Sequence, residues 1–293
     1  MQGLKRYCLL CAGAGGRVLF TKAGIPLIRC NNCGFIFLGV DRSHSALMAI
    51  YSEKLFASEG LEKYYLADDE TTRANSAAHV RFVERYKSSG RLLDVGCGFG
   101  YFLKALGPRW ASQGVEISEF ASGQARSRFG VEVVSADFPK ADLPPGSFDA
   151  ITMWDYIEHI PRPIDNLKKA HALLKPDGLL FLSTPDAGSF IARLMGRLWY
   201  HYDPLQHLCY FSSATLRMAL SMCGFKMLAL RHAGRCFNIE YLAYRFKYTY
   251  PGLWGNATYA ILRPLLRLLH IKSRHVRLNM GDIMTVCAAR AMS

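Results

Sequence analysis

The chain has 293 residues, of which 51% are hydrophobic and 20% are charged, and this composition excludes a disordered protein. The formal net charge of +13 favours an anionic partner, such as nucleic acid, an anionic membrane or a phosphorylated molecule, although a solvated basic surface also explains it. No run of about 18 uninterrupted apolar residues occurs, so we predict no membrane-spanning segment, and the apolar patch near residue 1 is too short for a secretory signal.

Four of the nine cysteines form two close pairs near the start of the chain. In each pair a tight turn directs two thiolates to one point, and two pairs supply the tetrahedral sulfur set that zinc prefers. We therefore predict a structural zinc ribbon over residues 1–40, with a redox dithiol as the alternative and no catalytic role for a closed site. The predicted zinc ligands are Cys8, Cys11, Cys30 and Cys33.

The other five cysteines are scattered through apolar segments, which favours reduced thiols and a cytoplasmic protein. Residues 41–75 are expected to form helical turns that link the ribbon to a main domain over 76–293. Apolar residues at helical spacing predict a helix over 76–87, directly before the first strand of that domain.

A short apolar strand over residues 91–95 ends in a turn that contains three glycines. Its sequence, Leu-Leu-Asp-Val, is typical of a parallel strand that is buried on both faces. The glycines permit a tight turn and a close approach of the backbone to a ligand. Two further strands are predicted over 113–117 and 131–138, and an acid, Glu116 or Asp137, lies near the end of each.

The fourth predicted strand, over 150–155, carries Trp154 and is followed by Glu158 and His159. Open α/β sheets bind ligands at the carboxyl ends of their strands. Positions i, i+3 and i+4 of a helical turn share a face, so Asp155, Glu158 and His159 are expected to converge. Such a set suits a divalent metal ion or a general base.

An amphipathic helix over 164–175 and a fifth strand over 179–185 follow. The next segment, 186–212, is predicted to be long and irregular, and it carries several aromatic residues together with His207. Aromatic and histidine side chains on a loop above the strand ends are typical of a substrate pocket.

Two edge strands over 226–231 and 283–289 enclose an insertion, 236–280, that combines a leucine-rich stripe with arginines and flanking aromatic residues. This pattern predicts either a helical cap that roofs the pocket or an interfacial helix that contacts the membrane. In the second case the protein would be peripheral to the inner face of the membrane.

The turn Asp94-Val-Gly-Cys-Gly-Phe-Gly100 resembles motif I of the S-adenosylmethionine-dependent methyltransferases with a Rossmann-like fold. The resemblance covers roughly residues 76–232. It implies a seven-stranded sheet with helices on both faces, and S-adenosylmethionine as the cofactor. In that family the acid of the turn holds the ammonium group, the acid of the next strand binds the ribose, and the third acid and its apolar neighbour contact the adenine. The cofactor-binding residues that the resemblance implies are Asp94, Gly96, Cys97, Gly98, Gly100, Glu116, Ile117, Asp137, Phe138 and Trp154.

The Glu-His pair, its following proline turn and the sequence LLKPDGLLFLSTP look like the ubiquinone-biosynthesis O-methyltransferases. Some of those enzymes use an acid-x-x-Glu-His set to hold a magnesium-class ion, although the first acid here, Asp155, is one methylene shorter. The resemblance implies transfer of a methyl group to a hydroxyl of a small or lipid-like molecule. His159 and His207 are the candidate bases, and Asp155 and Glu158 would orient a base or hold the ion.

Three alternatives remain open. An RNA methyltransferase would use the zinc ribbon and the basic surface to bind phosphates, but the basic residues are interleaved with apolar ones, so nucleic acid is the less favoured partner. Some sugar C-methyltransferases also carry an N-terminal zinc-binding module. The third alternative is a binding protein with a vestigial cofactor fold.

Overall fold

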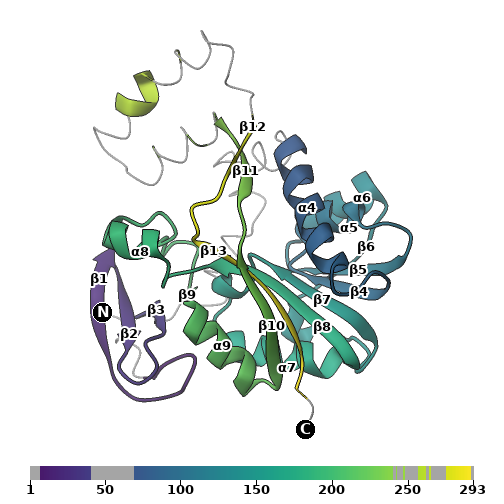
Figure 1. Ribbon diagram of the computed structural model, residues 1–293, viewed down its shortest axis with the longest axis horizontal. Helices are drawn as coiled ribbons and strands as arrows, with labels where there is room; N and C mark the ends of the chain where they lie inside the picture. The colour runs from purple at the N-terminus through teal and green to yellow at the C-terminus, as the bar shows by residue number, and fades with distance from the viewer. Residues whose placement is uncertain are drawn as a thin grey trace.

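A seven-stranded sheet lies at the centre of the computed structural model, which describes residues 7–40, 69–239, 242, 247, 257–261, 264 and 275–291 (Figure 1). The strand order is β10-β13-β8-β7-β4-β5-β6. Neighbours from β8 to β6 are parallel, whereas β13 runs antiparallel to both β8 and β10. The strands are β4 (Gly90–Val95), β5 (Trp110–Glu116), β6 (Glu132–Ser135), β7 (Phe148–Trp154), β8 (Leu174–Pro185), β10 (Phe225–His232) and β13 (Ile283–Arg290).

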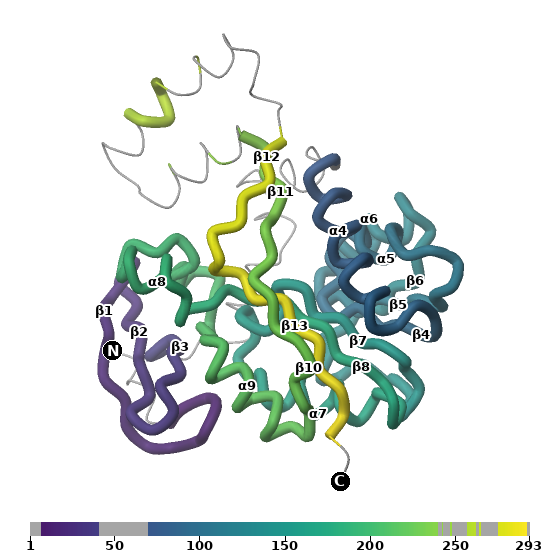
Figure 2. Tube along the Cα trace, viewed as in Figure 1, coloured from purple at the N-terminus to yellow at the C-terminus, as the bar shows by residue number. Residues whose placement is uncertain are grey.

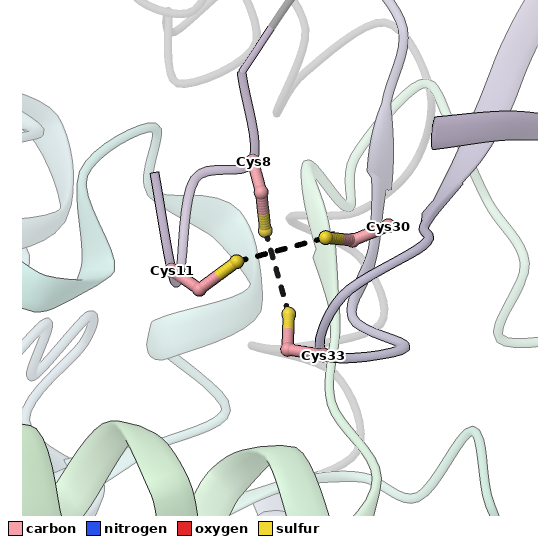
Figure 3. Close-up of side chains that lie close together, drawn as sticks. All are labelled: Cys8, Cys11, Cys30 and Cys33. Atoms are coloured by element: carbon pink, nitrogen blue, oxygen red, sulfur yellow. Dashed lines mark hydrogen bonds between the residues drawn. The ribbon is translucent and has the colours of Figure 1, made fainter. Parts of the chain in front are cut away.

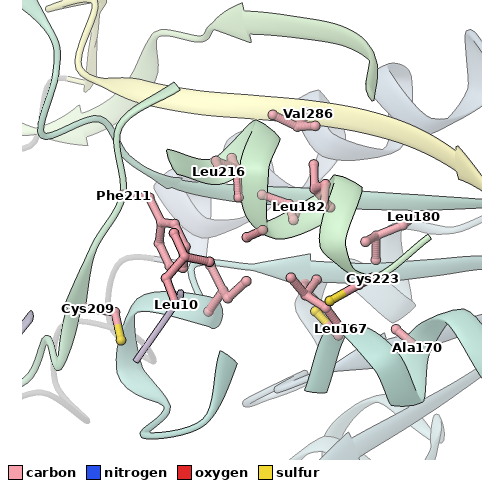
Figure 4. Packing of buried hydrophobic residues seen from close by; sticks show 14 of the residues in the cluster. Leu10, Leu167, Ala170, Leu180, Leu182, Cys209, Phe211, Leu216, Cys223 and Val286 are labelled. Atoms are coloured by element: carbon pink, nitrogen blue, oxygen red, sulfur yellow. The ribbon is translucent and has the colours of Figure 1, made fainter. Parts of the chain in front are cut away.

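Helices cover both faces of this sheet. One face packs against α4 (Asp69–Glu84), α5 (Tyr101–Ala105) and α6 (Glu119–Phe129), and the other against α7 (Pro163–Leu173) and α9 (Ser213–Met222). The central strands are apolar at successive positions because each side chain meets a helix layer: Leu92 packs on the α4 side and Leu93 on the α7 side. Figure 4 shows the second layer, with Leu167 of α7 and Leu216 of α9 near Leu182. The predicted α/β fold is confirmed.

A second, smaller sheet joins the N-terminal residues to the main domain. Its order is β1 (Gly16–Lys22), β2 (Ile25–Cys30), β3 (Ile36–Leu38) and β9 (Cys209–Tyr210). In this sheet, Ile36 pairs with Tyr210 and Phe37 with Cys209. The ribbon therefore shares a sheet with the methyltransferase-like part.

Several boundaries differ from the predictions. The helix expected over 76–87 starts earlier, at Asp69, so it takes in the end of the predicted linker 41–75, whose residues 41–68 lie outside the described residues. The segment 186–212 is not irregular throughout, because it contains α8 (Phe190–Met195), the short helix η3 (Gly196–Leu198) and β9. Contacts with a distant part of the chain hold this segment in place. The buried Asp282 accepts hydrogen bonds from the Trp199 indole, at 3.0 Å, and from the Tyr200 hydroxyl.

The insertion before the last strand begins and ends as an antiparallel ribbon of β11 (Arg235–Asn238) and β12 (His275–Leu278), which stands above the central sheet (Figure 2). The stripe predicted to be a cap or an interfacial helix lies largely outside the described residues, so both interpretations stay predictions. Within the part of the chain that the structure describes, no helix has the length and apolar character needed to cross a membrane.

Candidate active site

The glycine turn lies between β4 and α5, at the carboxyl edge of the sheet. Gly96, Gly98 and Gly100 all have left-handed backbones, with φ of +72°, +52° and +78°. A Cβ at position 96 would lie 2.6 Å from the Tyr156 ring, so only glycine fits there. A Cβ at position 98 would meet nothing within 4 Å, so the backbone there is open to a ligand.

Two buried carboxyl groups lie beneath this turn. Asp94 is 2% exposed, and its Oδ1 accepts a hydrogen bond of 2.6 Å from the Thr152 hydroxyl. Burial, with a further contribution from Glu116, raises the pKa of Asp94 to about 7. Glu116 accepts hydrogen bonds of 2.9 Å from the backbone N–H of both Gly98 and Ser118, and burial raises its pKa as well. Among the described residues neither carboxylate has an ion-pair partner, so the pair suits a ligand that carries a positive charge.

The remaining candidate cofactor residues differ in their exposure. Asp137 is half-buried and lies 3.9 Å from the Lys140 ammonium. The Phe138 ring is only 2% exposed and is packed in the core rather than presented to a ligand. Cys97 is also buried, whereas Ile117 is half-buried.

Trp154, at the end of β7, stacks on His79 of α4 with ring centroids 4.0 Å apart. Its indole Nε1 is buried and has no hydrogen-bond partner among the described residues. An indole N–H normally finds a partner when buried, so this one is available to a ligand.

A second cluster brings together Glu158, His159 and His207, whose candidate ligand atoms all lie within 4.8 Å of one another. Glu158 and His159 belong to the short helix η2 (Ile157–His159), and His207 precedes β9. The two imidazole rings meet edge to face, with centroids 4.7 Å apart. Residues 49 positions apart in the sequence therefore form one site.

Hydrogen bonds to the backbone set the tautomers of both histidines. The Nδ1 atom of His159 lies 3.1 Å from the Gln206 carbonyl, and that of His207 lies 2.9 Å from the His201 carbonyl. A carbonyl oxygen only accepts hydrogen bonds, so each Nδ1 carries the hydrogen. In the neutral rings, each Nε2 is then the atom with a lone pair, which can accept a proton or bind a metal.

Burial controls the charges in this cluster. It lowers the pKa of His159 to about 3, with His207 adding to the effect. Burial and the nearby Asp155 raise the pKa of Glu158 to about 8. Glu158 Oε2 has no hydrogen-bond partner among the described residues. At neutral pH the cluster therefore holds a neutral imidazole base beside a mostly protonated carboxyl group.

Asp155 does not join this cluster, contrary to the prediction that it converges with Glu158 and His159. It forms an ion pair with Arg235 of β11 and accepts a hydrogen bond of 2.9 Å from the Ser183 hydroxyl. Although burial opposes it, the charge of Arg235 holds the pKa of Asp155 well below its usual range. The helical spacing rule fails here because Asp155 has a left-handed backbone, with φ +49°, before η2 begins.

The four N-terminal cysteines point to one centre (Figure 3). The sulfurs of Cys8 and Cys33 are 3.6 Å apart, as are those of Cys11 and Cys30, and all four lie within 4.8 Å. A zinc ion with bonds of about 2.3 Å requires sulfurs about 3.8 Å apart in a tetrahedron. All nine cysteines are free, so the cluster contains no disulfide and its geometry fits zinc.

The cysteine cluster is connected to the histidine cluster through β9. The backbone N–H of Leu38, in β3, donates to the Leu208 carbonyl at 3.1 Å, and the Leu208 N–H donates to the Glu158 carbonyl at 2.8 Å. The segment that carries His207 is thus held between the ribbon and η2. Sequence reasoning missed this connection, because β9 has only two residues and no pattern that marks its partner.

The sheet order and the glycine turn above buried acids define the Rossmann-like methyltransferase fold. The chain belongs to the methyltransferase domain family, whose profile matches residues 67–230. It is 36% identical over 109 residues to a ubiquinone biosynthesis O-methyltransferase of Pseudomonas paraeruginosa, covering 34% of this chain and 47% of that protein. The corresponding protein of Xanthomonas campestris pv. campestris is 34% identical over 131 residues, covering 38% and 54%. The chain thus spans about half the length of these relatives.

Solved structures share the fold at low sequence identity. A SAM-dependent methyltransferase from Archaeoglobus fulgidus has a TM-score of 0.52 and 21% identity, covering 77% of this chain and 98% of that one. The 1,6-didemethyltoxoflavin-N1-methyltransferase of Burkholderia thailandensis, solved with bound 1,6-didemethyltoxoflavin and S-adenosylhomocysteine, has a TM-score of 0.51 and 15% identity, covering 95% of this chain and 100% of that one.

Proposed function

We propose that this chain is an S-adenosylmethionine-dependent methyltransferase that methylates a hydroxyl group of a small or lipid-like molecule. The observation that carries the proposal is the pair of buried acids beneath the open glycine turn, which offers negative charge and backbone space to a cationic cofactor. The O-methyltransferase relatives support a hydroxyl acceptor.

Bound S-adenosylmethionine would supply an electrophilic methyl group. In this chain, the backbone around Gly98 would lie against the cofactor, Asp94 would hold its ammonium group and Glu116 its ribose hydroxyls. To bind the ribose, Glu116 would have to share or exchange the two backbone hydrogen bonds that it now accepts. Asp137 would contact the adenine, while Phe138 would support this region from the core.

The histidine cluster would act on the acceptor. His159 would accept the hydroxyl proton as the oxygen becomes a nucleophile; burial keeps its imidazole neutral at physiological pH, but the pKa of about 3 also makes it a weak base. The protonated Glu158 can donate a hydrogen bond to the acceptor oxygen or to a histidine. Magnesium prefers a shell of oxygen ligands, whereas this cluster offers two imidazoles and one carboxyl group. The donor set therefore fits magnesium poorly, and we assign the proton transfer to the protein.

The proposal is tested by titrating the full chain with S-adenosylhomocysteine in a calorimeter. Labelled S-adenosylmethionine is then offered with three acceptors: a prenylated catechol, a nucleotide sugar and a structured RNA. We expect micromolar binding of S-adenosylhomocysteine and label on a hydroxyl oxygen of the catechol or of the sugar. Absence of binding would refute the enzyme class, and label only in the RNA, or only on a carbon of the sugar, would refute the acceptor class.

Glu158→Gln and His159→Asn are expected to lower kcat by about 10²- to 10⁴-fold, because each removes a group that handles the acceptor proton. Affinity for S-adenosylhomocysteine should remain within about threefold of wild type. Glu84→Gln is the matched control, since Glu84 forms only a surface ion pair, 3.1 Å long, with Arg109. A kcat close to wild type in both cluster variants would exclude a catalytic role for the cluster.

A further inference from the structure

A cavity of about 300 Å³ lies between α4, the end of β10 and the β11–β12 ribbon. Five arginines line it, four of them in α4, β10, β11 and β12 and one in the turn directly after α4, and among the described lining residues there is no aspartate or glutamate. The arginines are Arg81, Arg85, Arg231, Arg235 and Arg277. The volume is at the lower end of the range, on the order of 300–1,000 Å³, of small-ligand sites.

Most of this positive charge is not neutralised within the described residues. Arg235 pairs with Asp155, but the other four arginines have no ion-pair partner there. His79 also lines the cavity, and burial lowers its pKa to about 3, so it adds no charge. Arg81, Arg85, Arg231 and Arg277 are exposed to solvent, and guanidinium groups gathered around one open space attract an anion into it. Their planar donor geometry matches phosphate oxygens.

The cavity adjoins the candidate active site. The paired residues Arg231, Thr285, Ser183 and Trp154 form a row across β10, β13, β8 and β7. Arg231 and Thr285 line the cavity, and Trp154 stacks on His79, which also lines it. The ion pair of Arg235 with Asp155, directly after Trp154, adds a second link to the end of β7. A ligand held by the arginines would therefore lie beside the strand end that leads to Glu158 and His159.

The walls of the cavity are held together by polar contacts. The Asn75 side chain of α4 donates to the Cys236 carbonyl at 3.0 Å and accepts from the Cys236 N–H at 2.9 Å, which joins α4 to β11. Cys236 pairs in turn with Arg277 of β12. Asp155 fixes the guanidinium of Arg235. These contacts hold α4 and the ribbon beside each other, and among the five arginines the guanidinium of Arg235 is the one that they fix within the described residues.

We propose that this cavity binds a phosphate or diphosphate group of the acceptor, so that the methylated molecule is a phosphorylated small molecule. The inference rests on the proposed function, since it assigns the group that anchors the substrate of the same site. Either a prenyl-type lipid diphosphate or a nucleotide sugar would supply this chemistry. The anchored group would hold the acceptor while its hydroxyl lies at the histidine cluster.

The first test is calorimetric titration of the full chain, saturated with S-adenosylhomocysteine, with inorganic diphosphate. We expect binding that weakens at least tenfold in the double variant Arg231→Gln/Arg277→Gln. Arg217→Gln is the matched control, because Arg217 is an exposed arginine of α9, on the opposite face of the sheet, and should leave the affinity unchanged. Each variant should bind S-adenosylhomocysteine as wild type does, which shows that it is folded.

Three outcomes would overturn the inference: no diphosphate binding at millimolar concentration, an equal loss in the Arg217→Gln control, or competition between diphosphate and S-adenosylhomocysteine for one site. Failure of wild type to bind S-adenosylhomocysteine would instead refute the proposed function, whatever the diphosphate titration gives. Titrations with geranyl diphosphate and with UDP-glucose then distinguish a lipid diphosphate acceptor from a nucleotide-sugar acceptor. The compound that represents the natural acceptor class should bind more tightly than inorganic diphosphate. Structured RNA that binds tighter than both and depends on the same arginines would refute a small-molecule acceptor.

Discussion

Asp94→Asn is expected to bind S-adenosylhomocysteine about 10- to 100-fold more weakly than wild type, and yet to be at least as stable. The affinity falls because the variant removes the negative charge that would hold the ammonium group of the cofactor. Each tenfold loss of affinity corresponds to about 1.4 kcal/mol of binding free energy. The asparagine keeps the size of the side chain and an oxygen that can accept the Thr152 hydrogen bond. Calorimetric titration and chemical denaturation at pH 8 measure the two effects on the same samples.

The gain in stability follows from the sign of the pKa shift. Burial raises the pKa of Asp94 from 3.8 to about 7, so the folded state holds a proton that the unfolded state releases between these values. The protonated form favours folding below pH 3.8, and this contribution is lost as the pH rises through about 7. For such a shift the cost of the buried charge at pH 8 is on the order of 4 kcal/mol. Asp94→Asn should remove this pH dependence from the free energy of unfolding.

The same ionisation predicts the pH dependence of cofactor binding. A carboxyl group with a pKa of about 7 is roughly one-tenth ionised at pH 6 and nine-tenths at pH 8, so wild-type affinity should rise about tenfold over this interval. Asp94→Asn should bind equally weakly at both values. Asp177→Asn, which changes an exposed acid paired with Lys87, should behave as wild type. Unchanged affinity in Asp94→Asn at pH 8 would remove this residue from the cofactor site.

Cys30→Ser is expected to abolish zinc binding and to loosen the ribbon together with the segment that carries His207. A structural zinc site contributes on the order of 10 kcal/mol or more to folding in small modules, and the ribbon has too little core of its own to replace that contribution. Its strand β3 pairs with β9, so disorder in the ribbon should extend to residues 207–211. Metal analysis should give one zinc per wild-type chain and none in the variant.

Hydrogen exchange locates the effect of zinc loss. We expect faster exchange over residues 207–211 and at η2, where the Leu208 N–H bonds to Glu158, while the glycine turn keeps its protection. Cys223→Ser is the control, since this buried cysteine lies outside the cluster and its thiol donates only to the Ile164 carbonyl at 3.6 Å. It should retain zinc. Full zinc occupancy in Cys30→Ser, or unchanged exchange at 207–211, would contradict the link between ribbon and cluster.

Features that depend on residues close together in the chain could be predicted from the sequence alone. The apolar run before Gly96 indicated a strand buried on both faces, and the spacing of the glycines indicated the left-handed turn that follows. The two Cys-x-x-Cys pairs predicted a four-sulfur cluster, because each pair directs its own thiolates and only the docking of the two turns is non-local. The fold class followed from these motifs and from the family resemblance.

The side chains that meet at the carboxyl edge of the sheet could be identified only from the folded chain. Asp155 was expected beside Glu158 by helical spacing, but it pairs with Arg235, 80 residues away, and His207 takes its place in the cluster. The arginine cavity likewise collects residues from α4, β10, β11 and β12. A site between packed elements depends on the backbone direction at their ends, such as the left-handed Asp155, and on cross-strand register. Neither leaves a periodic pattern in the sequence.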